Sequence, residues 1–275
     1  MELNWLECFL YGLISGLTEF LPVSALAHQT VFLALLGKEQ SAALQLTAHL
    51  GALLALLITC APMLRRMNRE WRVYTMPKKR RRRHPDFGTL MEMRVFRTGT
   101  AMVLVLFLGY NLVHDLYQRL WLLAILLGIN GILLYIPQFL PGANKGAQSL
   151  SRLDAVLIGI AAGCGIVPGI SATGSAISIG RIRGADRKYA ADLALLLCIP
   201  GLLVLILLEV LGVAAAGFSF AGIHILFCCI TAVSSFLSAY WSIVLMRYLA
   251  VKVGYGGFAY YCWGLALFTL ILYLI

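Results

Sequence analysis

The chain has 275 residues, of which 61% are hydrophobic and 12% are charged, and its mean hydropathy is +0.87. Soluble domains are about half apolar and about a quarter charged, so this composition excludes a water-soluble globular protein. The formal net charge of +10 would suit a nucleic-acid-binding protein, but most of it lies in one loop, residues 64–97. Apolar stretches of about 20 residues recur between short polar breaks, which predicts an all-α polytopic membrane protein.

The first apolar segment, residues 5–36, is too long for one membrane span and too short for two. It is interrupted at Leu21-Pro22-Val23-Ser24. Proline lacks a backbone N–H and disfavours helix in the residue before it. The segment therefore predicts two half-helices joined inside the membrane, which form a re-entrant pair. A first full span is expected after it, at about residues 42–61.

The loop at 64–97 follows this span and contains twelve Lys and Arg residues against three acidic residues, a net charge of +9. Its densest part is Lys78-Lys79-Arg80-Arg81-Arg82-Arg83. Short basic loops stay on the cytoplasmic side of a membrane, so we interpret the run as a determinant of topology. Contact with anionic lipid headgroups is compatible with this interpretation. Nucleic-acid binding is not expected, because no folded binding module surrounds the run.

Two further spans are expected at about 98–114 and 119–139. A second interrupted segment, residues 153–184, breaks at Pro168-Gly169-Ile170-Ser171 and predicts a second re-entrant pair. Three more spans follow it, which makes about six spans and two re-entrant pairs in all. These last spans are expected at about 190–212, 222–248 and 254–275.

The two interrupted segments resemble each other. In each, a Gly-x3-Gly pair is followed by a proline and a serine, and three matched positions recur at a constant offset of 147 residues. This pattern predicts a duplication, with a first repeat at 1–140 and a second at 150–275. The matched positions are Gly12 and Gly159, Gly16 and Gly163, and Ser24 and Ser171.

An odd number of spans in each repeat would invert the second repeat relative to the first. The two re-entrant pairs should then enter from opposite faces and meet near the midplane, where inverted-repeat proteins bind their substrates. The same topology places the loops at 140–152 and 181–188 on the side of the 64–97 loop, together with Arg247 and Lys252. It places the uncharged turn at 213–221 on the other side.

Non-helical backbone inside a membrane is stable only where it is buried in protein or lines a polar cavity. After each break a half-helix is expected to begin at Ser24 or Ser171, because serine is a favoured N-cap. A helix N-terminus carries unpaired N–H groups and a partial positive charge, so two such ends converging on one cavity suit a phosphate or diphosphate. The alternative is that the breaks only permit tight helix packing.

Glu19 and His28 flank the first break, and ionisable residues inside a bilayer are costly unless they are functional or paired. His28 follows Ser24 by four residues, so both lie on one face of the second half-helix. These three residues could bind phosphate, shuttle protons or perform general acid–base work. A hydrogen-bonded structural trio is the alternative. Weaker candidates in apolar surroundings are His49, Asp192 and Glu209.

At these residues the chain resembles the undecaprenyl-diphosphate phosphatase family, the bacitracin-resistance type of membrane phosphatase. The family's signatures run approximately E-G-x-T-E-x-L-P-V-S-S-T-G-H and P-G-x-S-R-S-G-A-T. The resemblance extends to length and span order, so it covers essentially the whole chain. The corresponding strings here are Ser15-Gly16-Leu17-Thr18-Glu19-Phe20-Leu21-Pro22-Val23-Ser24-Ala25-Leu26-Ala27-His28 and Pro168-Gly169-Ile170-Ser171-Ala172-Thr173-Gly174-Ser175-Ala176.

The resemblance implies dephosphorylation of undecaprenyl diphosphate to the monophosphate, in the recycling of the cell-wall (peptidoglycan) carrier lipid at a bacterial inner membrane. It implies Ca²⁺ or Mg²⁺ as cofactor if the chain is an enzyme. The expected partners are a polyprenyl (di)phosphate and membrane lipids, and a homodimer is left open. The implied site residues are Glu19, Ser24 and His28 for catalysis, Glu19 also as a metal ligand, and Ser171, Thr173 and Gly174 for phosphate binding.

Two family positions differ in this chain: the first glutamate of the first signature is Ser15, and the arginine of the second is Ala172. Loss of an arginine that stabilises a phosphoryl-transfer transition state can cost about 10³–10⁵ in rate. The lost glutamate would remove a metal ligand or an acid–base partner. Arg181 and Arg183 lie roughly 14–17 Å beyond Ala172 along a helix, so neither replaces the missing guanidinium simply.

These differences leave other functions open. One is a catalytically impaired paralogue that transports a polyprenyl phosphate by alternating access, because inverted duplication is common among transporters. Another is a non-catalytic lipid-binding or scaffold protein, which gives no reason to retain Glu19 and His28.

Overall fold

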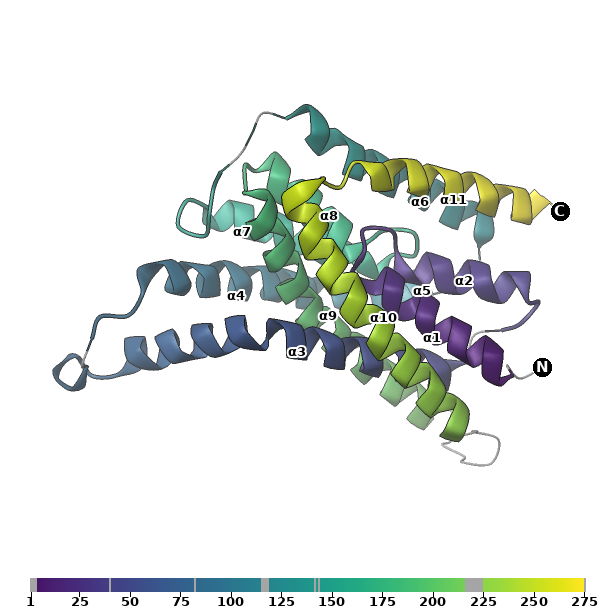
Figure 1. The fold of residues 1–275 in the computed structure, drawn as a ribbon, viewed down its shortest axis with the longest axis horizontal. Coiled ribbons are helices and arrows are strands. Elements are labelled where there is room, and N and C mark those ends of the chain that lie inside the picture. Colours follow the sequence, from purple (N-terminus) through teal and green to yellow (C-terminus); the bar gives the residue numbers. More distant parts are fainter. Residues whose placement is uncertain are drawn as a thin grey trace.

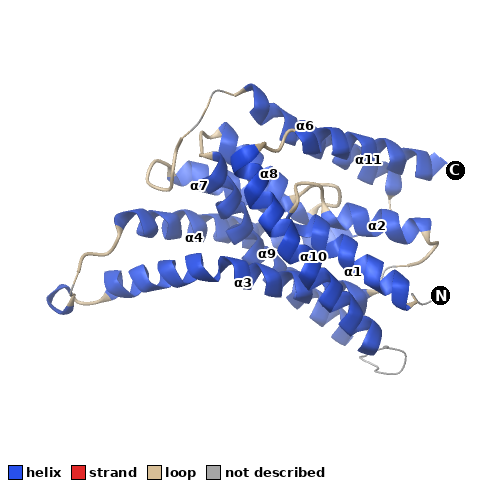
Figure 2. Cartoon of the chain, viewed as in Figure 1, coloured by secondary structure: helices blue, strands red, loops and turns tan. Residues whose placement is uncertain are grey.

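The computed structural model describes residues 4–39, 41–81, 83–114, 119–140, 142, 144–215 and 225–274. These residues form the helical bundle of Figure 1. Figure 2 draws them as helices and loops. The described residues form no strand, and their β-type pairing is limited to an isolated bridge between Lys145 and Ala185. Arg82 of the basic run and residues 216–221 of the predicted turn lie outside the described residues.

The helices follow the predicted order in both halves of the chain. The first half contains α1 (Trp5–Phe20), α2 (Ala25–Leu35), α3 (Ala42–Thr75), a 3-10 turn (Lys78–Arg80), α4 (Phe87–Phe107), α5 (Tyr110–His114), α6 (Leu120–Tyr135) and a 3-10 turn (Ile136–Phe139). The second half contains α7 (Arg152–Gly163), a 3-10 turn (Cys164–Ile166), α8 (Ala172–Ile182), α9 (Arg187–Ala215), α10 (Ile225–Lys252) and α11 (Gly257–Leu274).

Five of the described helices, α3, α6, α9, α10 and α11, are long and apolar enough to cross a membrane. The chain is therefore an all-α polytopic membrane protein, as the sequence predicts. The helices observed near the expected span at 98–114 have different bounds. Helix α4 starts within the basic loop, and the chain is interrupted at Leu108–Gly109 before α5 begins. The first half of α4 carries Glu92, Arg94 and Arg97, which makes it too polar to belong to the apolar set.

Hydrogen bonds join the loops that the sequence predicts to share one side of the bundle. Arg94, at the end of the basic loop, donates to the Leu150 carbonyl at 3.0 Å. The Lys145 N–H donates to Gly184 O at 3.0 Å, and the Asp186 N–H donates back to Lys145 O at 3.0 Å. In Figure 1 the basic loop lies at the left end of the view, and both chain ends lie at the right. The common side of these loops is confirmed, and its cytoplasmic assignment stays a prediction.

The Gly-x3-Gly pairs allow each first half-helix to pack closely on a helix from the other half of the chain. A Cβ atom at Gly16 of α1 would lie 2.1 Å from the Ser235 carbonyl oxygen of α10. A Cβ atom at Gly159 of α7 would lie 2.5 Å from the Gly99 carbonyl oxygen of α4. Helix α1 thus packs on α10, and α7 packs on α4. Each first half-helix thus packs on a helix from the other half of the chain, as expected for a two-fold duplication. The duplication and the repeat bounds stay a prediction.

Replacing Gly16 by alanine is expected to destabilise the bundle by about 1–3 kcal/mol, because the new methyl group meets backbone that cannot move alone. Gly264 of α11 is the matched control, since no atom lies within 4 Å of a Cβ placed there. Alanine at Gly264 should be neutral or stabilising by up to about 1 kcal/mol, through helix propensity. Thermal unfolding in detergent compares the two variants, and equal melting temperatures would contradict the packing role of Gly16.

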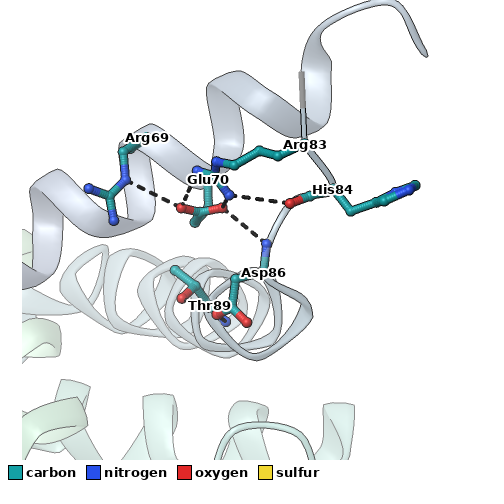
Figure 3. Close-up of polar contacts among 6 residues, drawn as sticks. All are labelled: Arg69, Glu70, Arg83, His84, Asp86 and Thr89. Carbon is teal, nitrogen blue, oxygen red and sulfur yellow. Dashed lines mark hydrogen bonds and ion pairs between the residues drawn. The ribbon is translucent and has the colours of Figure 1, made fainter. Parts of the chain in front are cut away.

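Glu70, in the charged end of α3 beyond its apolar part, organises the basic loop (Figure 3). Arg83 donates to both carboxylate oxygens of Glu70, at 2.8 and 2.7 Å. The same carboxylate accepts from the Asp86 N–H at 3.0 Å and from Arg69 Nε at 3.3 Å. Asp86 in turn caps α4 by accepting from the Thr89 N–H at 2.8 Å. Glu70 is therefore buried, 3% exposed, although it lies in the most basic part of the chain.

Replacing Glu70 by glutamine is expected to loosen this loop and to increase trypsin cleavage at Lys78–Arg80 at neutral pH. The hydrogen bonds from Arg83, and then that from the Asp86 N–H, lower the pKa of Glu70 from its usual 4.5 to about 2. The carboxylate therefore contributes its full stability above pH 4.5 and loses it as the pH falls through about 2.

Glu92→Gln is the control for this experiment, because Glu92 pairs with Arg66 at a more exposed position of the same helices. Exposed ion pairs contribute little to stability. The Glu92 variant should therefore be cleaved at the wild-type rate. Equal cleavage of the Glu70 variant and the wild type would show that Glu70 does not hold the loop.

Candidate active site

The two helix breaks are bonded directly to each other. The Gly169 N–H donates to Ser24 Oγ at 3.1 Å. Asn130 of α6 bridges the breaks, because its amide nitrogen donates to Pro22 O at 3.1 Å and its amide oxygen accepts from the Ser171 N–H at 2.9 Å. These bonds pair backbone groups that a break would otherwise leave unsatisfied in an apolar bundle.

The two re-entrant pairs reach this meeting point from different ends of the molecule. In Figure 1, α1 and α2 lie on the side of the N-terminus, whereas α7 lies on the side of the basic loop. The predicted meeting of the two pairs is therefore confirmed by the structure.

Ser24 holds an unusual backbone conformation at the first break. Its φ is 67°, in the left-handed region that residues other than glycine rarely adopt. Such strain is typical of functional positions that the surrounding structure enforces. Ser24 occupies the N-cap position of α2, as predicted, but its side chain makes no capping hydrogen bond. The expected capping role is wrong for Ser24, because Oγ accepts from Gly169 instead.

Ser171 caps the second half-helix as the sequence predicts. Its Oγ accepts from the Gly174 N–H at 3.1 Å and lies 3.0 Å from Thr173 Oγ1. Both hydroxyl groups also donate to the Leu21 carbonyl of the first break, at 3.3 and 3.2 Å. The Gly174 N–H and the Thr173 hydroxyl are thus engaged within the protein. Their binding of phosphate stays a prediction.

A cavity of about 60 Å³ lies beside the joined breaks, and we call it the break cavity. Its volume holds a few water molecules, at about 10–15 Å³ each. Half-buried Glu19 contributes a carboxylate from α1, and His49 contributes an imidazole from α3. The apolar part of the wall comes from α2, α4, α7, α8 and α9, and from the chain between α7 and α8. The polar residues in the lining are Glu19, Ser24, His49 and Ser171.

His28 is not among the residues that line the break cavity. Its Nδ1 lies 2.8 Å from the Ser24 carbonyl oxygen, and its Nε2 lies 2.7 Å from Tyr261 Oη of α11. The two rings are stacked, with centroids 5.7 Å apart. The structure therefore brings Glu19, Ser24 and Ser171 together and places the His28 ring against α11. The catalytic role of His28 stays a prediction.

The two substituted family positions lie in different surroundings. Ser15 Oγ donates to the carbonyl one turn earlier in α1 at 2.6 Å, whereas Ala172 lines the break cavity. Arg181 donates to the carbonyl four residues further on at 2.7 Å, and Arg183 donates to the Asp154 carboxylate at 2.6 Å. Neither guanidinium group lines the cavity, which confirms that these arginines do not replace the one missing at Ala172.

Two of the weaker candidates, His49 and Glu209, belong to this region. His49 lines the cavity, and its Nδ1 bonds to Glu209 Oε1 at 2.8 Å. Asp192, another weak candidate, pairs with Arg247 at 3.1 Å outside the cavity. Asn130 was not singled out, although an amide in the middle of an apolar span is itself a signal of a specific partner.

Within the described ranges, no group of three or more His, Cys, Asp or Glu residues could hold a metal ion. Mg²⁺ is commonly held by one or two carboxylates together with phosphate oxygens of the substrate, and Ca²⁺ also takes oxygen ligands. Glu19 and the hydroxyl groups of Ser24 and Ser171 fit such a site when a bound phosphate supplies further oxygens.

Comparison with known proteins assigns the chain to a family. The model of the family described as bacitracin resistance protein BacA matches residues 8–268, which include both helix breaks. The chain belongs to this family. A similar protein is the undecaprenyl-diphosphatase of Carboxydothermus hydrogenoformans, 29% identical over 98% of both chains. The undecaprenyl-diphosphatase of Acidothermus cellulolyticus is 31% identical over 90% of this chain and 89% of its own. That of Nocardioides sp. is 31% identical over 73% of this chain and 72% of its own.

Proposed function

We propose that this BacA family member is an undecaprenyl-diphosphate phosphatase, which binds and dephosphorylates the polyprenyl carrier lipid of cell-wall synthesis in a bacterial inner membrane. The break cavity carries the proposal, because Glu19, Ser24 and Ser171 meet there between two half-helices of an apolar bundle. The names of the similar proteins support the substrate class. The charge of the 64–97 loop supports its placement on the cytoplasmic side.

The reaction adds water across the diphosphate anhydride. The bond between the terminal phosphorus and the bridging oxygen breaks, which yields inorganic phosphate and the polyprenyl monophosphate. Glu19 is the proposed base that accepts a proton from the attacking water, and Ser24 and Ser171 donate to phosphoryl oxygens. His28 is the proposed proton donor to the leaving oxygen, a role that requires its ring to leave Tyr261 and turn toward the break cavity. In the alternative role of Glu19, its carboxylate would instead help to hold a Ca²⁺ or Mg²⁺ ion, which would neutralise charge on the phosphoryl oxygens.

A specific observation favours a second function. Ser15 and Ala172 remove a carboxylate and a guanidinium from the family pattern, and Ala172 lines the break cavity. Such a site retains hydrogen-bond donors for an anion while it loses groups that stabilise a transition state. The alternative is a transporter that moves a polyprenyl phosphate across the bilayer by alternating access between the two halves.

One experiment separates the two functions. The purified full chain in detergent is given undecaprenyl diphosphate with Mg²⁺ or Ca²⁺, and both inorganic phosphate and lipid binding are measured. Phosphate release that is lost in Glu19→Ala and His28→Ala supports the phosphatase. Saturable binding without release, lost in the same variants, supports the transporter. Absence of both binding and release would contradict both functions.

A further inference from the structure

His49 reaches the break cavity from α3, and Glu209 of α9 holds its ring in place. His49 Nδ1 lies 2.8 Å from Glu209 Oε1, and the two side chains are 1% and 4% exposed. Because Nδ1 is bonded to the carboxylate, Nε2 is the ring nitrogen left for another partner. This nitrogen is buried and has no hydrogen-bond partner among the described residues.

A buried ring nitrogen without a partner needs a physical explanation, because buried polar atoms in proteins are nearly always hydrogen-bonded. An ionisable pair inside an apolar bundle is also costly and marks a functional position by default. Packing between α3 and α9 could be achieved with apolar side chains at lower cost. The break cavity, which His49 lines, offers the space in which a ligand would complete the hydrogen bonds of Nε2.

The cavity lining combines one carboxylate, Glu19, with one group that can become a cation, and this second group indicates the class of ligand. Among the described residues that line the cavity, His49 alone can carry a positive charge, because no lysine or arginine is present in the lining. The Glu209 carboxylate stabilises the imidazolium form through a charge-assisted hydrogen bond. An imidazolium with Nδ1 bonded to Glu209 can donate only from Nε2. The hydroxyl group of Ser24 lines the same space and adds a neutral donor, whereas that of Ser171 donates to the Leu21 carbonyl.

We infer that His49 is the phosphate-binding cation of the break cavity, fixed by Glu209 and donating from Nε2 to a phosphoryl oxygen of the bound lipid diphosphate. This inference rests on the proposed function, since it names a residue that binds the same substrate. It also explains how the cavity binds an anion although Ala172 contributes no charge to its lining. His49 and Glu209 come from the two halves of the chain, so their hydrogen bond forms only when α3 and α9 pack together.

The test is His49→Gln in the purified full chain, with farnesyl diphosphate, a short soluble polyprenyl diphosphate, as the probe. Glutamine keeps a hydrogen bond to Glu209 and removes the charge. Binding, measured by isothermal titration calorimetry, should weaken by about 10- to 100-fold, as expected for one charge-assisted hydrogen bond. His84→Gln is the matched control, because His84 is an exposed histidine of the basic loop, and it should bind as the wild type does.

A second variant, Glu209→Gln, removes the counter-ion while it retains an oxygen acceptor for Nδ1. It should also weaken binding, and it carries the test if His49→Gln does not yield folded protein. Wild-type affinity in folded His49→Gln or Glu209→Gln would overturn the role of His49 alone. Unchanged affinity with lost phosphate release would also overturn it, because the imidazole would then transfer protons. A wild-type chain that binds no farnesyl diphosphate would contradict the proposed function itself.

Discussion

Replacing Glu19 by glutamine is expected to lower the rate of phosphate release from undecaprenyl diphosphate by about 10²–10⁴-fold, the range for loss of a general acid–base group. Among the described residues that line the break cavity, Glu19 alone supplies a carboxylate. Glutamine has nearly the same shape but cannot accept the proton of an attacking water, and it is a poor ligand for Ca²⁺ or Mg²⁺. The measurement is the turnover number at saturating lipid, by a colorimetric phosphate assay.

Glu39→Gln is the matched control, because Glu39 is an exposed carboxylate between α2 and α3. It should retain wild-type turnover. The Glu19 variant should keep the wild-type melting temperature, since the substitution preserves side-chain volume. Turnover by Glu19→Gln within a few-fold of the wild type would show that this carboxylate is neither the base nor a required metal ligand.

Replacing Asn130 by leucine is expected to destabilise the protein by about 2–6 kcal/mol. The change leaves the buried Ser171 N–H without its partner, and it leaves Pro22 O with only a long contact from the Cys262 thiol at 3.8 Å. Each loss costs about 1–3 kcal/mol. Because these groups belong to the two different breaks, the variant should also lose phosphate release through disorder of the site. Unfolding by titration with denaturing detergent measures the loss of stability.

Ile129→Leu is the control for this substitution, since Ile129 is the preceding residue of α6 and is exposed at the surface of the bundle. It should unfold at the wild-type detergent concentration. Wild-type stability of Asn130→Leu would mean that the breaks are held together by packing alone, without the bridge through Asn130.

The helical class and the position of both breaks follow from local sequence. A membrane leaves backbone polar groups without water, so apolar segments of spanning length become helices wherever proline does not prevent it. Pro22 and Pro168 coincide with the two breaks, which the structure confirms, although Pro62 and Pro200 lie inside α3 and α9 without ending them. The span at 98–114 was less predictable, because α4 is a continuous helix from the basic loop into the bundle and the change from polar to apolar residues does not mark its start.

The candidate site was partly predictable. Glu19, Ser24 and Ser171 are recognisable because ionisable and cap residues next to a proline break are rare in an apolar chain, and the structure brings them to one cavity. The orientation of His28 was not predictable, because helical spacing relates it to Ser24 but does not show that Tyr261 of α11 lies within 2.7 Å of its Nε2.

The resemblance of the two interrupted segments was enough to predict that they meet, since matched half-helices with opposite orientation converge on one site. Only the tertiary structure decided what surrounds that meeting point. His49 and Glu209 are 160 residues apart and each looks like an isolated polar residue in its own span. Their pairing, and the ring nitrogen that has no partner among the described residues, depend on how α3 packs against α9. Contacts between helices far apart in the chain leave no periodic signal in the sequence of either one.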